Sequence, residues 1–178
     1  TGKGFELETQ IAPSKYIRVN LGVALSDTKI DDKVTCVAAG AGLLDRGGTP
    51  CPTNPAQVMV DGGSLPGPRW TANASLYVAQ PVGDGEVYFQ TDWAYKGRSY
   101  DLIPVAPLEN FNSPWTKGNA SIGYKFNNDA FDVSVFVNNI TNLYYAEGAL
   151  NFFNYQGKTL TAQVTDPRSW GLRLGYNF

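Results

Sequence analysis

Few side chains in this sequence have the type and spacing that enzyme chemistry requires. The chain has no histidine, which excludes His-based acid–base catalysis and His metal ligands. Glu6 and Glu8 lie two positions apart on one face of an expected strand, where paired carboxylates are more often solvated or ion-paired than catalytic. The sequence also has no GxSxG nucleophile motif and no glycine-rich phosphate loop. We therefore predict no enzyme activity, no metal site and no cofactor.

The two cysteines, Cys36 and Cys51, are the remaining candidates for chemistry. Both lie in one polar segment rich in glycine and proline, and nothing nearby would complete a metal site with them. In an oxidising compartment they would form a disulfide, which stabilises a chain with a loop of this size by about 3 kcal/mol. Two free thiols are the alternative.

Length and composition limit the kind of protein that positions these residues. The 178 residues are enough for one domain, and the net charge of −2 gives no reason to expect a nucleic-acid partner. No stretch of about 18 apolar residues is present, so the sequence predicts no transmembrane helix. A transmembrane barrel stays compatible with this composition, because its strands place polar side chains at every second position.

The last stretch, residues 168–178, alternates strictly between apolar and polar side chains. Its apolar positions would all lie on one face of an extended strand. Six earlier stretches alternate in the same way, so we predict seven antiparallel strands. The earlier stretches are 3–11, 16–28, 70–78, 86–98, 115–126 and 131–138.

The connections between these stretches alternate between short turns and long loops. The long loops are predicted at about 31–68, 99–114 and 146–167, and within the first of them residues 34–39 and 58–60 could add a hairpin. Aromatic residues collect at both ends of the predicted strands. Short turns on one side, long loops on the other and two aromatic belts are typical of outer-membrane barrels. The sequence therefore predicts an all-β fold, a transmembrane antiparallel β-barrel.

The alternation also predicts which side chains face lipid and which face the lumen. Charged side chains on the lipid face would cost about 2 to 4 kcal/mol each at mid-depth, so the polar set is assigned to the lumen. Leu21, Val23, Leu76, Phe89, Ile122, Val135 and Leu174 are predicted to contact lipid. The charged and polar residues predicted to line the lumen are Glu6, Glu8, Arg18, Asn20, Gln90, Asp92, Lys96, Arg98, Lys125, Asp132 and Arg173, with Asn73, Ser121 and Ser134 beside them.

Two segments near the end carry a family resemblance. VFVNNITNLYY, residues 135–145, contains an Asn-aliphatic-Thr-Asn motif followed by tyrosines, and DPRSWGLRLGYNF, residues 166–178, contains Pro-Arg before a last strand that ends in Phe. Together with LPGPRWTANASLYV at 65–78 and YKGRSY at 95–100, they resemble the C-terminal part of TonB-dependent outer-membrane receptors. The resemblance extends over essentially the whole chain.

This resemblance implies a barrel of about 22 strands, of which residues 1–178 would supply the last seven or so. The odd number of strands also leads us to expect a part of a larger barrel, without its plug domain. The implied function is uptake of a scarce nutrient, such as a siderophore, vitamin or saccharide, across the outer membrane of a Gram-negative bacterium. The implied partners are outer-membrane lipid, the rest of the barrel, the plug, TonB and the barrel assembly machinery. Leu174, Tyr176 and Phe178 would carry the assembly signal.

Two other functions fit parts of the pattern. A small self-standing barrel of eight strands with a structural or adhesive role would also alternate short turns with longer loops. A soluble carbohydrate-binding β-sandwich would account for the many aromatic residues, but it requires the apolar faces of two sheets to meet each other.

Overall fold

The computed structural model describes residues 1–29, 35–38, 49–60, 67–100, 111–126, 130–152 and 159–177. All regular elements in these residues are β-strands. The strands are β1 Gly2–Ser14, β2 Ile17–Thr28, β3 Thr35–Ala38, β4 Gln57–Val60, β5 Gly67–Pro68, β6 Trp70–Val82, β7 Gly85–Lys96, β8 Ser99–Tyr100, β9 Phe111–Asn112, β10 Trp115–Phe126, β11 Phe131–Asn138, β12 Ala146–Phe152, β13 Thr159–Val164 and β14 Ser169–Tyr176. Among the described residues no helix is long and apolar enough to cross a membrane.

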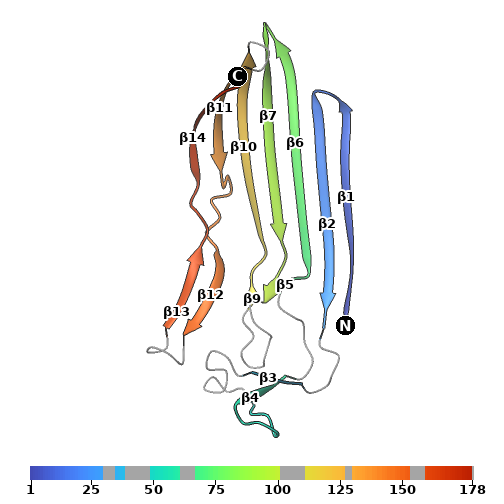
Figure 1. Cartoon of the computed structure of the whole chain (residues 1–178), viewed down its shortest axis with the longest axis vertical. Helices are drawn as coiled ribbons and strands as arrows, with labels where there is room; N and C mark the ends of the chain where they lie inside the picture. Colours follow the sequence, from blue (N-terminus) through green and yellow to red (C-terminus); the bar gives the residue numbers. More distant parts are fainter. Residues whose placement is uncertain are drawn as a thin grey trace.

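The long strands form one antiparallel sheet of seven strands in the order β1-β2-β6-β7-β10-β11-β14. Each strand pairs with the next long strand in the chain, and the sheet forms a single curved layer (Figure 1). Among the described strands, β1 and β14 pair with one neighbour each in this sheet, so the sheet has two open edges. This is the expected all-β antiparallel fold, and its shape is that of a section of barrel wall.

Short turns connect the long strands at one end of the sheet. The β6–β7 turn consists of Gly83 and Asp84 between the paired residues Val82 and Gly85. Gly83 has a φ of 60°, which a side-chain-bearing residue adopts reluctantly and which the first position of a type II′ hairpin turn requires. A two-residue turn fixes the register of the strands on both sides of it. Residues of β6 are therefore paired with residues of β7 whose side chains lie on the same face of the sheet.

The long connections lie at the other end of the sheet and carry small sheets of their own (Figure 1). In the first connection β3 pairs with β4, which confirms the hairpin considered for residues 34–39 and 58–60. The hairpin of β12 and β13 in the third connection was not predicted, because 146–167 reads as a loop. Its register shifts between Ala146 and Gly148. Such a bulge adds a residue to one strand and breaks the period of two on which strand prediction depends.

The faces of the seven-stranded sheet have no second layer over them in the described part of the chain. The outward apolar side chains are therefore exposed, for example Ile122 at 55% and Leu174 at 71%. A soluble sandwich buries such residues between two sheets. The described residues do not form the sandwich that was considered as an alternative.

Candidate functional site

The register of the sheet gives it one polar face and one apolar face. Residues that are paired across antiparallel strands point to the same side of the sheet. One row of paired residues crosses six strands, from Arg18 through Tyr77, Gln90, Ser121 and Phe136 to Gly171. A neighbouring row runs from Gln10 through Asn20, Ser75 and Asp92 to Asn119. The polar face is continuous across the sheet.

The residues predicted to line the lumen share this polar face, with one exception. The strand was expected to continue to residue 98, but β7 ends at Lys96 and the Gly97 N–H donates to the Trp70 carbonyl oxygen at 2.8 Å. Arg98 lies beyond that point, so the alternation of β7 no longer assigns it to a face. The residues that share the face are Glu6, Glu8, Arg18, Asn20, Gln90, Asp92, Lys96, Lys125, Asp132 and Arg173.

Amide and hydroxyl groups connect neighbouring strands across the middle of this face. Asn20 Nδ2 donates to Ser75 Oγ at 2.8 Å, and Asn119 Nδ2 donates to Asp92 Oδ2 at 2.6 Å. Asn20, Ser75 and Asp92 contribute to a shallow concavity of about 640 Å³ that Glu8 and Asn73 also line. Carboxylates and amides at such a surface form hydrogen bonds to water or to a polar partner, and in contact with lipid they would stay unsolvated.

A second polar cluster lies on the same face near the short turns. The rings of Tyr77 and Tyr88 stack with their centroids 6.0 Å apart, and Lys125 Nζ lies 5.3 Å from the Tyr88 ring centroid. The Tyr88 hydroxyl donates to Asp132 Oδ1 at 2.9 Å, and the Tyr77 hydroxyl donates to Glu86 Oε1 at 3.0 Å. Cation–π contacts and hydrogen bonds from tyrosine hydroxyls to carboxylates hold these side chains in place. This end of the sheet's polar face therefore stays both ordered and polar.

Phe136 is an aromatic residue on the polar face that the sequence reading passed over. It is paired with Gly171, and a Cβ atom at position 171 would meet the Phe136 ring at 2.9 Å. The glycine therefore leaves the space that the ring occupies, as in other cross-strand Gly–aromatic pairs. Arg173 lies over the same ring, with its guanidinium carbon 5.3 Å from the centroid. The glycine opposite an inward phenylalanine was the available signal.

The apolar face meets the requirements of a surface in contact with lipid. Its one hydroxyl near mid-strand on β7 is satisfied internally, because Thr91 Oγ1 donates to the Asn119 carbonyl oxygen at 2.8 Å. Internal pairing is necessary where water is absent. Two residues of the predicted assembly signal, Leu174 and Tyr176, are exposed on this face. Phe178, the third, lies outside the described residues.

Aromatic side chains form rows at both ends of the apolar face. Near the short turns a row crosses three strands, with centroid separations of 5.9 Å for Tyr124–Phe126, 5.2 Å for Phe126–Phe131 and 4.9 Å for Phe131–Tyr176. Near the long connections, Phe5 and Trp70 meet edge to face at 5.8 Å. Aromatic residues favour the two interfaces of a membrane, so these rows mark the boundaries of an apolar band.

A disulfide joins Cys36 on β3 to Cys51, as predicted, with the Cα atoms 5.9 Å apart. Cys51 is buried at 2% exposure, and its N–H donates to the Gln57 carbonyl oxygen at 2.9 Å. The bridge therefore ties the β3–β4 hairpin to the turn that precedes β4. Within the described residues no group of three or more His, Cys, Asp or Glu side chains could hold a metal ion.

The Asn-aliphatic-Thr-Asn motif forms a buried hydrogen-bond node centred on Asn139. Asn139 is 1% exposed and has a φ of 53°, a left-handed conformation that asparagine tolerates better than most residues. Its Nδ2 donates to the carbonyl oxygens of Leu143 at 3.0 Å and Asp166 at 2.9 Å. Its Oδ1 accepts from the Leu143 N–H at 2.8 Å, and its own N–H donates to Asn119 Oδ1 at 2.9 Å. This node connects β10, the end of β11 and the approach to β14.

A family model described as TonB dependent receptor-like, beta-barrel, matches residues 1–143. The chain belongs to the TonB-dependent receptor β-barrel family. No curated protein and no solved structure matches it. The matched residues contain six of the seven long strands, and β14 continues the same sheet by pairing with β11. The resemblance seen in the sequence motifs is thus confirmed.

Membership of the TonB-dependent receptor family fixes the broad function. These receptors are outer-membrane transporters of Gram-negative bacteria and not enzymes, and in general they contain a plug domain and interact with TonB. The separation of polar and apolar faces in this sheet is the arrangement that a barrel wall between a lumen and lipid requires.

Proposed function

We propose that this chain forms part of the wall of an outer-membrane transporter that takes up a scarce nutrient, a siderophore, a vitamin or a saccharide. The polar face lines a lumen filled by water and a plug domain, and the apolar face contacts lipid. The observation that carries this proposal is the mainly polar face that the register aligns across the seven strands, with exposed apolar side chains on the other side. Family membership supplies the link to TonB-dependent transport.

We also propose that Leu174, Tyr176 and Phe178 form the signal by which the barrel assembly machinery recognises the chain. The supporting observation is that Leu174 and Tyr176 are 71% and 61% exposed on an edge strand. An edge strand with an apolar row can add to another sheet through its free backbone groups. Residues 31–68, 99–114 and 146–167 are proposed to lie on the extracellular side.

The orientation of the wall can be tested at two adjacent positions of β10. We expect a nitroxide attached to Cys in an Ile122→Cys variant of the full-length receptor to collide with oxygen dissolved in the bilayer. In a Ser121→Cys variant the nitroxide should collide with a water-soluble nickel complex, because Ser121 pairs with Gln90 on the polar face. Electron paramagnetic resonance in liposomes measures both. The native cysteines are bonded to each other and stay unlabelled without reductant.

The adjacent positions are at nearly the same depth, so a difference between them reports the face and not the height in the membrane. Water exposure at residue 122 together with oxygen exposure at residue 121 would show that the faces are reversed. Water exposure at both would show that this sheet does not contact lipid. Either result would refute the proposed wall.

The transport function can be tested by uptake in cells. Deletion of the gene is expected to abolish uptake of one member of a panel of radiolabelled nutrients: a ferric siderophore, cobalamin or a maltodextrin. A protonophore should stop the same uptake in the complemented strain, because the family draws energy through TonB. Passage of many small solutes without energy would instead identify a passive barrel, and unchanged uptake of the whole panel would contradict the proposal.

A further inference from the structure

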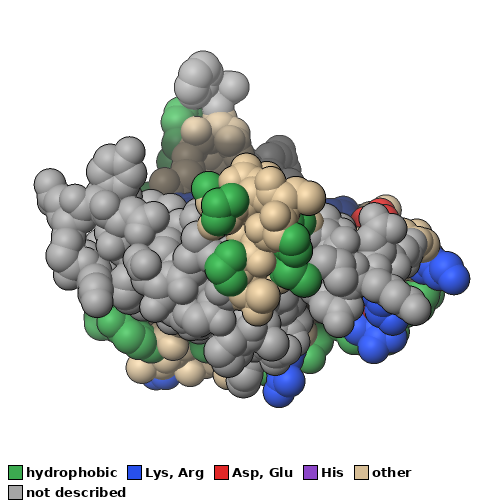
Figure 2. Space-filling view, turned by 90° about the horizontal axis from the view of Figure 1, so that it is seen from below, with side chains coloured by type: hydrophobic (Ala, Val, Ile, Leu, Met, Phe, Trp, Pro, Cys, Tyr) green, Lys and Arg blue, Asp and Glu red, His purple; other side chains and the backbone are tan. Residues whose placement is uncertain are grey.

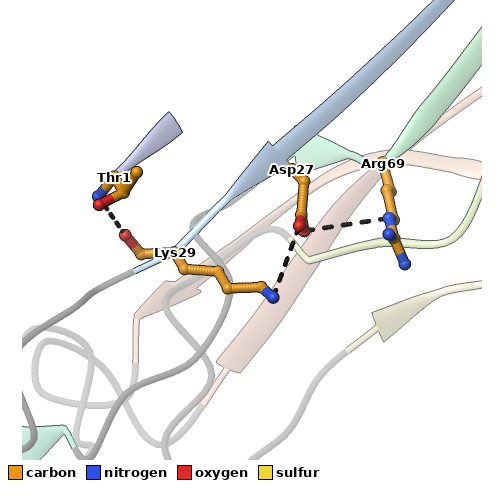
Figure 3. A network of polar contacts seen from close by, with 4 residues as sticks. All are labelled: Thr1, Asp27, Lys29 and Arg69. Atoms are coloured by element: carbon orange, nitrogen blue, oxygen red, sulfur yellow. Dashed lines mark hydrogen bonds and ion pairs between the residues drawn. The ribbon is translucent and has the colours of Figure 1, made fainter. Parts of the chain in front are cut away.

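A group of charged side chains lies on the outward side of the wall, where β1, β2 and the entry to β6 meet. Lys29 Nζ lies 3.5 Å from Asp27 Oδ2, and Arg69 Nε lies 3.9 Å from Asp27 Oδ1 (Figure 3). Lys3 is directly opposite Asp27 in the register. These four residues, Lys3, Asp27, Lys29 and Arg69, are called the rim cluster below. They come from three segments that are distant in the sequence.

The positions of Lys3, Asp27 and Lys29 follow from the same alternation that defines the apolar face, whereas Arg69, at the bend before β6, joins them through its contact with Asp27. Lys3 lies two residues before Phe5, and Asp27 lies two residues after Leu25, so both point to the side that Phe5 and Leu25 occupy. The ladder continues beyond them, because the N–H of Lys29 donates to the Thr1 carbonyl oxygen at 2.9 Å. Lys29 therefore also points outward.

The rim cluster lies just beyond the aromatic end of the apolar band. Phe5 pairs with Leu25, Leu25 pairs with Trp70, and the Phe5 and Trp70 rings meet at 5.8 Å. One further step along the strands, roughly 7 Å away, brings the chain to Lys3 and Asp27. Aromatic residues mark the level of lipid headgroups. A charged group one step further out is within reach of those headgroups.

The rim cluster is positively charged and accessible. The rim cluster contains three cations and one carboxylate, which leaves two positive charges in excess among its four residues. The Lys29 and Arg69 side chains are 59% and 65% exposed, whereas Asp27 is 29% exposed. Arg69 contacts Asp27 through Nε, so its terminal amino groups point away from that contact as donors. Seen from the end of the long connections, Lys and Arg side chains gather on the side where β1 and β2 lie (Figure 2).

We propose that the rim cluster binds the phosphate groups of an anionic glycolipid in the outer leaflet. Lysine and arginine are the side chains that bind phosphate, arginine through a planar fork and lysine as a mobile point charge. The carboxylate of Asp27 holds two of the cations side by side and so presets their spacing. The acyl chains of such a lipid would lie along the exposed apolar row that starts at Phe5. This inference rests on the proposed placement of the chain in the outer membrane.

The test compares lipids and charge variants of the full-length receptor in nanodiscs. Replacement of Lys3, Lys29 and Arg69 together by Gln is expected to weaken binding of bis-phosphorylated lipid A by roughly a hundredfold, since each cation near a charged membrane surface contributes about fivefold. Dephosphorylated lipid A should bind weakly to both proteins. The matched control replaces three cations of the polar face, Lys96, Lys117 and Lys125, by Gln, and should bind the phosphorylated lipid as the wild type does.

Several outcomes would overturn the inference. The phosphorylated and dephosphorylated lipids could bind equally, the rim and control variants could weaken binding equally, or millimolar inorganic phosphate could displace the lipid and reveal a general anion site. Heat-modified mobility in gel electrophoresis verifies that both variants are folded. The nitroxide pair at residues 121 and 122 is measured on the same preparations. If the labels at residues 121 and 122 report the expected faces but the rim variant binds the lipid as the wild type does, the rim site alone is refuted. If the labels do not report the expected faces, the proposed wall is refuted.

Discussion

Deletion of Phe178 from the full-length receptor is expected to cause a large loss of folded protein in the outer membrane, much larger than the side chain's contribution to stability explains. Loss of one aromatic side chain from an apolar surface costs on the order of 1.5 to 3 kcal/mol. Our reason for expecting more is that β14 is an edge strand with a continuous exposed apolar row. Such a strand has to stay extended and recognisable until its free edge is paired.

The matched control is Phe131→Ala. Phe131 belongs to the aromatic row near the short turns and lies 5.2 Å from Phe126 and 4.9 Å from Tyr176, measured between ring centroids. Its removal deletes an interfacial aromatic without touching the last strand. Folded yield is measured in outer-membrane fractions by heat-modified gel mobility. Equal and mild losses for the two variants would mean that Phe178 is one more interfacial aromatic and that the assembly signal lies elsewhere.

Replacement of Asn139 by Ala is expected to destabilise the end of the wall near the long connections by about 2 to 4 kcal/mol, because buried backbone groups lose their partners. The Leu143 N–H and the Asp166 carbonyl oxygen are both paired with the Asn139 side chain. Alanine also adopts the φ of 53° at this position unfavourably. The midpoint of urea unfolding in liposomes, followed by tryptophan fluorescence, measures the loss.

Two further variants separate the causes of this loss. Asn139→Gly relieves the backbone but removes the same hydrogen bonds, so we expect it to stay strongly destabilised. Asn138→Ala changes the neighbouring residue, whose side chain reaches Ser169 only at 3.5 Å, and should have a small effect. Wild-type stability of the Gly variant would show that the backbone conformation alone matters. Comparable losses at 138 and 139 would show that the node has no special role.

The sequence-based prediction and the structure differ most where the alternation of side chains between the two faces of a strand is interrupted. The β12–β13 hairpin contains a register shift between Ala146 and Gly148, so its alternation is interrupted and the segment reads as a loop. Arg98 was assigned to the polar face by counting onward along β7, but β7 ends at Lys96 and residue 98 lies between β7 and β8, so its assignment stays a prediction. Counting along a strand is reliable only while the backbone stays extended.

The amino-acid sequence by itself determined which face of each long strand is polar. Side chains alternate between the two faces of an extended strand with a period of two. A two-residue turn such as that at Gly83 fixes the register, so paired residues of the next strand lie on the same face. Glu8, Asp92 and Arg173 could therefore be assigned to one side without coordinates, and the terminal motifs indicated the family that the match over residues 1–143 shows.

Only the tertiary structure decided which residues from distant segments meet. The Asn139 node requires Asp166 to lie beside the end of β11, and the rim cluster requires Arg69 to reach Asp27 across the first long connection. Neither contact has a period or a fixed spacing in the sequence. Strand alternation reports the direction of a side chain, because that direction depends on the local backbone alone. The neighbours that a side chain meets depend on how strands pair and on the path of the long connections between them.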